Sequence, residues 1–179
     1  MARGKTTLTI PPEWDLFLSA VDRALSRACT LRCLGGFALT AVYGLPRSTA
    51  DMDYIEIAPL ENETQLLSVA GRGSKLAKKH GFYIQRTTVA KYPDEFESRM
   101  DKLELGLRNL NVYILGPYDL ALSKVCTDRP KDMEDARYLI KTASLKLSEF
   151  MRIWEAEMAY QVAPRFRIDI DIASEYFEK

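Results

Sequence analysis

The sequence has little of the residue types on which several common chemistries depend. It contains one histidine, His80, and three cysteines, Cys29, Cys33 and Cys126, without a C-x-x-C pair. A Ser-His-Asp triad, a Cys-His pair or a histidine-rich metal site would each have to use that one histidine, so these chemistries have little room. The odd number of cysteines fits reduced thiols better than a disulfide framework or a zinc site.

Long apolar runs and an excess of one charge are also missing. No apolar stretch in the sequence approaches the roughly 20 residues that span a bilayer, and the first ten residues do not resemble a secretory leader. Lysine plus arginine equal aspartate plus glutamate at 25 each, so no overall field draws the chain to nucleic acid. We therefore expect a cytoplasmic protein without a membrane partner.

The chain is nevertheless large enough to bury a core. Its 179 residues are 47% hydrophobic and 28% charged, which fits one domain or one domain with a helical extension. Helical and extended patterns alternate in the first part, and the remainder is mostly helical. We expect an α+β fold in which residues 1–115 form a core with a small mixed β-sheet flanked by helices, and residues 116–179 form a helical part packed on it.

Periodicity and turn residues place the individual elements. Helices are predicted at residues 13–28, 37–44, 63–80, 117–126, 131–143 and 147–161. Strands are predicted at residues 30–34, 51–57, 82–89 and 111–115, with a weaker candidate at 102–107.

Two glycines and two acids in the stretch from residue 34 to residue 57 suggest a site that binds phosphate and a metal ion. Gly35 and Gly36 precede a predicted helix, where unpaired N–H groups and the absence of side chains suit a phosphate chain. Asp51 and Asp53 are two apart on a predicted strand, so both should project from one face with Cα atoms roughly 7 Å apart. Two carboxylates on one face suit Mg²⁺, and two ions could be held. Each feature also has a structural reading, as a turn and as a solvent-facing strand.

The chain repeats the alternating acids near its C-terminus. Asp169 and Asp171 stand in "FRIDIDIAS" without a glycine pair before them. Because the phosphate-binding half of the pattern is missing, we interpret this copy as an exposed polar face or the start of a helix.

Two separated motifs in the sequence resemble those of a known family. "GGFALTAVYGLPRSTADMD" and, downstream, "GPYDLALSKVCTDRPKDMEDARYLI" are similar to the signatures of the nucleotidyltransferase fold of the DNA polymerase beta superfamily. The variant is that of AbiEii-type abortive-infection toxins and related uncharacterised nucleotidyltransferases. Together the two motifs and the elements between them cover most of the span from Leu34 to Ile140.

The resemblance implies a Mg²⁺-dependent enzyme that moves a nucleoside monophosphate from a nucleoside triphosphate to an acceptor hydroxyl. Asp51 and Asp53 would hold Mg²⁺, and they and Lys124 would be catalytic. The acceptor would be a tRNA end, a protein or a small molecule, and a toxin-like member would have a cognate antitoxin as partner. The residues expected to bind the nucleotide are Gly35, Gly36, Arg47, Ser48, Lys124, Asp132 and Asp135.

Several of these residues have a structural alternative. Asp132 and Asp135 are three apart and could simply stabilise the start of a helix. Lys124 could be a solvated lysine or one that covers the core. Arg47 could reach a phosphate or pair with one of the acids at positions 51 and 53.

Active members of the superfamily often carry a third carboxylate on a neighbouring strand, which can act as general base. Asp101, Glu104 and Glu56 are the candidates. Glu56 is the weakest, because its odd offset from Asp53 predicts that it lies on the opposite face of the strand.

Two other classes of function are compatible with the sequence. The fold could persist without catalysis, as a nucleotide-binding or antitoxin-like interaction module. A nucleic-acid-binding domain could instead use Lys75, Lys78, Lys79 and Arg86, although such a run of charge usually forms a solvated helix face. The acceptor, the preferred base and the oligomeric state stay open.

Overall fold

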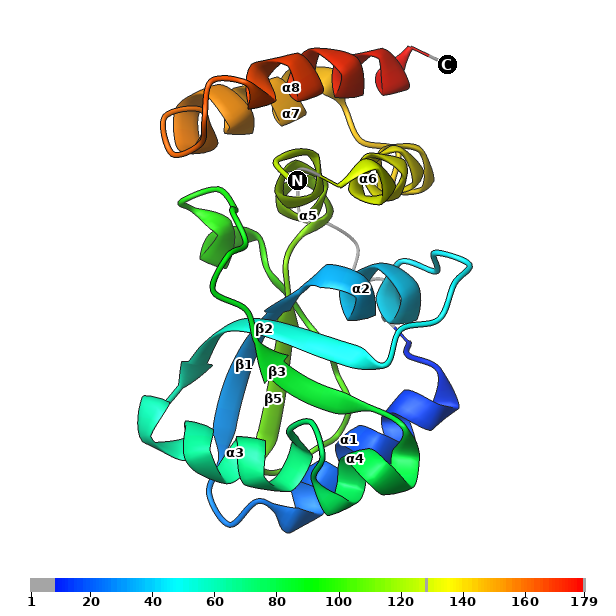
Figure 1. Ribbon diagram of the computed structural model, residues 1–179, viewed down its shortest axis with the longest axis vertical. Coiled ribbons are helices and arrows are strands. Elements are labelled where there is room, and N and C mark those ends of the chain that lie inside the picture. Colours follow the sequence, from blue (N-terminus) through cyan, green and yellow to red (C-terminus); the bar gives the residue numbers. More distant parts are fainter. Residues whose placement is uncertain (1–8, 128, 179) are drawn as a thin grey trace. The chain divides into compact units, whose positions relative to one another are not determined.

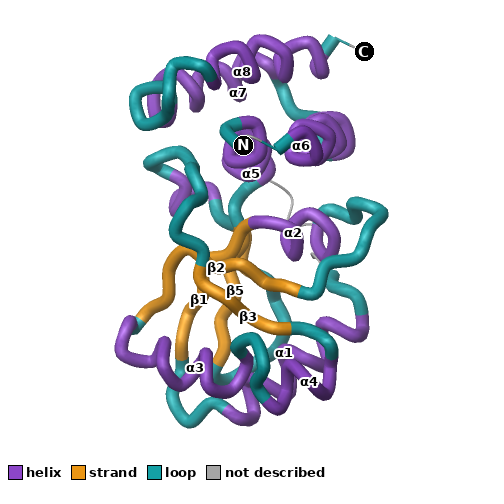
Figure 2. Tube along the Cα trace, viewed as in Figure 1, coloured by secondary structure: helices purple, strands orange, loops and turns teal. Residues whose placement is uncertain are grey.

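The structure is a computed structural model that describes residues 9–127 and 129–178. The chain divides into two compact units (Figure 1). Of the described residues, the first unit comprises those up to Thr87 together with Asp101–Ile114, and the second comprises Thr88–Met100 and those from Leu115 onward. Figure 2 shows that the first unit contains the sheet and the second is helical. The predicted α+β class is confirmed, with 52% helix and a five-stranded mixed sheet.

The sheet of the first unit has the strand order β3-β2-β1-β5-β4. Its strands are β1 (Cys29–Leu34), β2 (Asp51–Ala58), β3 (Tyr83–Arg86), β4 (Asp101–Lys102) and β5 (Leu110–Ile114). β1 is antiparallel to β2 and parallel to β5, while β3 runs parallel to β2 and β4 antiparallel to β5. The strands predicted at 30–34, 51–57 and 111–115 are confirmed, whereas those predicted at 82–89 and 102–107 are much shorter.

Helices α1 (Pro12–Ala24), α3 (Glu63–Ala70) and α4 (Lys75–His80) pack against one another in the first unit (Figure 1). Their contacts with the sheet bury an aromatic cluster. Trp14 stacks on Phe82 with ring centroids 4.2 Å apart and meets Phe37 edge-on at 4.7 Å. Phe17 beside them is fully buried. The predicted first helix is confirmed, although it ends at Ala24 rather than near residue 28.

The prediction of one continuous helix from residue 63 to residue 80 is wrong, because two helices, α3 and α4, occupy this range. Gly71 ends α3, since a Cβ on this residue would lie 2.4 Å from the carbonyl oxygen of Leu67. Ser74 then begins α4 by accepting a hydrogen bond from the backbone N–H of Ala77 at 3.1 Å. Such a cap starts a new helix axis. Gly81 ends α4 as predicted, in the left-handed conformation.

The second unit consists of helices and one connecting segment. Its helices are α5 (Pro117–Val125), α6 (Pro130–Thr142), α7 (Leu147–Ile153), which continues as a π-helical turn at Trp154–Met158, and α8 (Phe166–Ser174). The three helices predicted from residue 117 onward are confirmed. "FRIDIDIAS" forms α8, in agreement with a helical reading of the second acid repeat. Within residues 9–127 and 129–178, no helix combines the length and apolar character that a membrane crossing requires.

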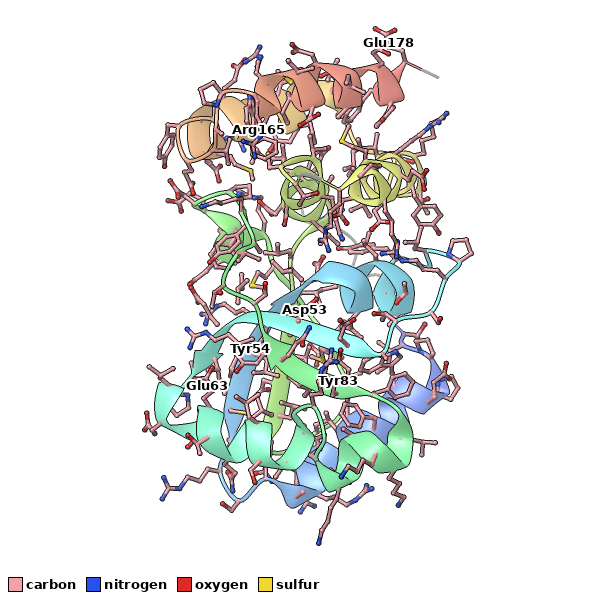
Figure 3. The ribbon with its side chains drawn as sticks, viewed as in Figure 1. Asp53, Tyr54, Glu63, Tyr83, Arg165 and Glu178 are labelled. Carbon is pink, nitrogen blue, oxygen red and sulfur yellow. The ribbon has the colours of Figure 1, made fainter. Side chains whose placement is uncertain are left out.

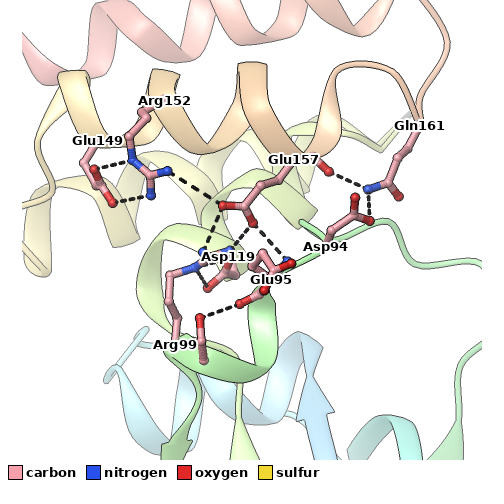
Figure 4. A network of polar contacts seen from close by, with 9 residues as sticks. Asp94, Glu95, Arg99, Asp119, Glu149, Arg152, Glu157 and Gln161 are labelled. Carbon is pink, nitrogen blue, oxygen red and sulfur yellow. Dashed lines mark hydrogen bonds and ion pairs between the residues drawn. The ribbon is translucent and has the colours of Figure 1, made fainter.

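An arginine ties the segment 88–100 to the helices of the second unit (Figure 4). The guanidinium of Arg99 donates to both carboxylate oxygens of Asp119 at 2.7–3.0 Å and to both of Glu157 at 2.5–3.0 Å. Asp119 is fully buried. A buried carboxylate needs such a charged partner, which explains why this segment folds with the second unit although it precedes β4 in the chain.

We predict that Phe17→Ala destabilises the first unit by about 3–5 kcal/mol, because it opens a cavity in the aromatic cluster. Urea denaturation followed by tryptophan fluorescence measures the change. The neighbouring residue Leu16 is 62% exposed, so Leu16→Ala is the matched control and should change stability by less than about 0.5 kcal/mol. Equal losses of stability in the two variants would contradict the structure, in which α1 buries Phe17 and exposes Leu16.

Candidate functional site

Asp51 and Asp53, hereafter the acid pair, lie on the same face of β2. The opposite face carries Met52, which is fully buried and in register with the fully buried Ile84 of β3. The acid pair is partly exposed. The predicted arrangement of the two carboxylates on one face is confirmed, because Met52 anchors the other face of the strand in the core.

The glycine turn touches the acid strand. Leu34, the last residue of β1, is in register with Asp53, and the helical segment from Gly35 to Val42 begins directly after it. Gly35 has φ +80°, and a Cβ on it would lie 2.7 Å from Oδ2 of Asp53, whose place on β2 is labelled in Figure 3. A Cβ on Gly36 would lie 2.9 Å from Oγ1 of Thr49. Asp53 on β2 and Thr49 in the loop before it therefore approach the two glycines more closely than a side chain at either position would allow without a shift.

Neutral donors hold the acid pair in place. Oγ1 of Thr49 donates to Oδ1 of Asp51 at 2.6 Å. Nε2 of Gln85, on β3, donates to Oδ1 of Asp53 at 2.9 Å and lies 3.3 Å from Oδ2 of Asp51. The sequence analysis did not identify Gln85 or Thr49. The alternation of Gln85 with Ile84 was a signal for its face, but the pairing of β3 with β2 was not evident from the chain.

A bulge in β2 changes the position of Glu56. Arg32 is in register with Glu56, and the next residue of β1, Cys33, is in register with Tyr54, so Ile55 is an extra residue. An extra residue reverses the alternation of faces along the strand. Glu56 therefore shares the face of the acid pair, and the prediction that it lies on the opposite face is wrong. Its Oε2 lies 3.4 Å from Nη1 of Arg32, which neutralises it.

The other two candidates for a third carboxylate lie away from the acid pair. Asp101 is in register with Ile114 of β5, and β1 separates β5 from β2. Three strand spacings place it ~14 Å from β2. Oδ2 of Asp101 lies 3.5 Å from the hydroxyl of Tyr43, and Glu104 is exposed beyond β4. The strands next to β2 are β3 and β1. Opposite Asp53 they present Gln85 and Leu34, neither of which is a carboxylate.

The residues of the downstream motif form one buried network in the second unit. Nζ of Lys124, on α5, donates to Oδ1 of Asp132 at 2.6 Å and lies 3.3 Å from Oδ2 of Asp135. Oγ1 of Thr127 and Nε of Arg129 reach Oδ2 of Asp132 at 2.9 and 2.7 Å. The structure thus brings together the lysine and the two aspartates that the sequence singled out. The alternative of a solvated Lys124 is wrong, because its side chain is only 9% exposed.

The network sets the protonation of Asp132. Burial raises the pKa of this carboxyl, but the hydrogen bonds from Lys124 and Thr127 and the charges of Lys124 and Arg129 outweigh burial. The pKa of Asp132 therefore lies below its ordinary value. The Asp132 carboxylate therefore stays ionised, and paired with Lys124, at a lower pH than an ordinary aspartate would.

The remaining residues expected to bind the nucleotide lie in the loop before β2. Ser48 is exposed and Arg47 is partly exposed. The backbone N–H of Arg47 donates to the carbonyl oxygen of Leu45 at 2.7 Å, which tightens the turn. Ser48 precedes Thr49, so the loop leads directly to the hydroxyl that holds Asp51.

The histidine and the cysteines occupy packed surroundings. His80 lies against Phe17 with ring centroids 5.8 Å apart. The three cysteines are free and buried. Burial, followed by the charge of Asp22, raises the pKa of Cys29 to about 11, and burial, followed by the charge of Asp169, raises that of Cys126 to about 12. Thiols with such raised pKa values are poor nucleophiles.

The described ranges, 9–127 and 129–178, contain no group of three or more His, Cys, Asp or Glu side chains arranged to hold a metal ion. A family model described as "Nucleotidyltransferase of unknown function (DUF6036)" matches residues 16–179. The chain belongs to this nucleotidyltransferase family. No curated protein and no solved structure matches it. The family match covers both motifs, so the glycine turn with its acid pair and the Lys124 network are features of a nucleotidyltransferase family member.

We predict that Gly35→Ala destabilises the first unit more than Gly73→Ala. Both glycines have positive φ, +80° and +84°, but a Cβ at Gly73 would meet no atom within 4 Å. Each alanine costs about 1–2 kcal/mol for its backbone conformation. The clash with Asp53 should add about 1–3 kcal/mol at Gly35, as measured by urea denaturation. Equal losses of stability in the two variants would mean that the position of the Asp53 carboxylate does not depend on the missing side chain at Gly35.

We also predict a pH-dependent effect of Asp132→Asn. At neutral pH the variant should be less stable by about 3 kcal/mol, because Lys124 loses a buried partner. The folded pKa of Asp132 is lowered, so the advantage of the native chain should shrink as pH falls from about 5 to about 3. Denaturation at each pH measures this. Glu134 is exposed on the same helix, and Glu134→Gln, the control, should change stability by less than about 0.5 kcal/mol. A gap that is constant with pH would contradict the ion pair.

Proposed function

We propose that the protein is a Mg²⁺-dependent nucleotidyltransferase that moves a nucleoside monophosphate from a nucleoside triphosphate to an acceptor hydroxyl. One observation carries this proposal: the backbone of Gly35 lies directly against Asp53, on the face of β2 that also carries Asp51. A helix start without side chains and two carboxylates are what a metal-bound triphosphate requires at one place.

The donor set of the acid pair suits a hard divalent cation. Two carboxylates present oxygen ligands on one face, and Thr49 and Gln85, which hydrogen bond to them, are neutral groups that can be exchanged. Asp51 and Asp53 would hold Mg²⁺. The bound ion would neutralise phosphate charge and stabilise the charge that develops in the transition state.

The side chains and backbone of the site have separate tasks in this proposal. The N–H groups at the start of the helical segment 35–42 would orient the phosphates. The acceptor oxygen would attack the α-phosphorus, the bond to the β-phosphate would break, and pyrophosphate would leave. Because β3 offers Gln85 rather than a third acid beside the pair, we assign the proton of the acceptor hydroxyl to a carboxylate of the pair.

The proposed roles of the other nucleotide-binding residues and the proposed biological setting rest on the two sequence motifs and their order. Lys124 would supply positive charge to the triphosphate, since a lysine held by two carboxylates still has a third N–H to donate. Arg47, Ser48, Asp132 and Asp135 would complete the nucleotide site. The resemblance to AbiEii-type toxins extends the proposal to the enzyme of a toxin–antitoxin system, with a tRNA end or a protein as acceptor and an antitoxin as partner.

A second candidate function is a nucleotide-binding module without catalysis. The observation that favours it is that the side chain bridging the acid pair from β3 is the neutral Gln85, while Asp101 and Glu104, two of the predicted third carboxylates, lie away from the pair. The two candidates differ in turnover, because a binding module would retain the triphosphate without releasing pyrophosphate.

We predict that Asp51→Ala/Asp53→Ala abolishes transfer, because both proposed carboxylate ligands of the cation are removed. The assay combines each α-³²P-labelled triphosphate with Mg²⁺, total tRNA and cell protein. The control is Asp169→Ala/Asp171→Ala, which removes the same spacing of acids from α8, where Asp171 is exposed and pairs with Arg167 across one turn. This control should transfer label at the native rate.

Loss of labelling in both double variants would mean that removing two acids anywhere in the chain reduces transfer, and it would contradict a specific role for Asp51 and Asp53. Labelling that survives in Asp51→Ala/Asp53→Ala would overturn the proposed function. Triphosphate binding without labelling by the native chain would favour the binding module.

A further inference from the structure

The residue opposite the acid pair is an amide. Gln85 is in register with Asp53 on the neighbouring parallel strand, so the two side chains leave the sheet on the same face. Its Nε2 bridges the pair, at 2.9 Å from Asp53 and 3.3 Å from Asp51. A single NH₂ group carries two hydrogens and can serve both carboxylates. The amide oxygen must face away from them, because ionised carboxylates only accept hydrogen bonds.

The hydrogen bonds from Gln85 offset the repulsion between the two carboxylates. Two carboxylates on one strand face repel each other, and a shared donor stabilises both in place. The pair carries two negative charges, which one divalent cation balances. A carboxylate in the position of Gln85 would bring the charge to three.

From this geometry we infer that Gln85 is a positioning residue that responds to the metal ion; the inference rests on the proposed function of the acid pair. Without the cation, the NH₂ group of Gln85 holds the two carboxylates together. With a cation bound, the two carboxylates would serve as its ligands, and rotation of the amide about its terminal bond would turn Oε1 toward it. That rotation is soft and roughly two-fold, and a neutral amide oxygen is an accepted ligand for hard cations.

Two substitutions separate the roles of the amide. Gln85→Met keeps the length of the stem but removes the donor and the oxygen. Gln85→Glu keeps the oxygen and adds a charge. The control is Gln65→Met, since Gln65 is a partly buried glutamine of the same unit whose amide donates to Ser26 instead of to the acids.

The experiment measures Mn²⁺ uptake by electron paramagnetic resonance, with and without a non-hydrolysable triphosphate, and thermal stability in chelator. Gln85→Met should bind Mn²⁺ about tenfold more weakly, and Gln85→Glu about tenfold more tightly. In chelator, Gln85→Glu should melt below the native chain, and Mn²⁺ should reverse the order. Gln65→Met should bind Mn²⁺ as the native chain does.

Each outcome bears on a different claim. Native Mn²⁺ uptake that neither Gln85 substitution alters would overturn the role of Gln85 and leave the proposed function standing. Uptake that depends on Gln85, together with no transfer from any triphosphate, would support the role of Gln85 and overturn the proposed function. No uptake with or without triphosphate would overturn both.

Discussion

The contact between the backbone of Gly35 and the carboxylate of Asp53 is the constraint on which the candidate site depends. A Cβ at residue 35 would lie 2.7 Å from Oδ2 of Asp53, so a side chain there would force this carboxylate to shift. The same residue has a positive φ, which lets the chain turn sharply from β1 into the helical segment. Thr49 and Gln85 then fix the acids from the side and from the next strand.

The two motifs hold their charged groups in opposite ways. The acid pair is partly exposed and accepts hydrogen bonds from Thr49 and Gln85, which are neutral donors that a cation can replace. Lys124 and its two aspartates are buried, and their charges compensate one another. Exposed carboxylates with exchangeable partners suit a site that binds and releases a charged ligand, whereas a buried ion pair fixes geometry. The acid pair is therefore the proposed chemical centre, and the Lys124 network fixes the geometry of α5 and α6 within the second unit.

Much of the site could be predicted from the sequence because its signals are local. The alternation of Asp51 and Asp53 with buried residues placed both acids on one face, and the glycine pair marked the start of a helix. The spacing of Asp132 and Asp135 placed them on one face of α6. These patterns depend on residues a few positions apart, which the geometry of strands and helices determines directly.

The wrong or missing predictions concern features that depend on residues far apart in the chain or on an irregularity within a strand. The bulge at Ile55 reverses the face of Glu56, and nothing in the run "DMDYIEI" marks which residue is extra. The parallel pairing of β3 with β2 brings Gln85 to the acids from 32 residues away. The break between α3 and α4 was more accessible, because Gly71, Gly73 and Ser74 interrupt the helical pattern. The third carboxylate was expected on a neighbouring strand, and the neighbour presents an amide.

The most direct test of the account is a crystal structure of the chain with Mn²⁺ and a non-hydrolysable triphosphate, in which anomalous scattering locates the metal. We expect the Mn²⁺ to be coordinated by carboxylate oxygens of Asp51 and Asp53, with triphosphate oxygens at the N–H groups that follow Leu34. A metal bound elsewhere, or a triphosphate that does not contact the Gly35–Gly36 turn, would contradict the central claim.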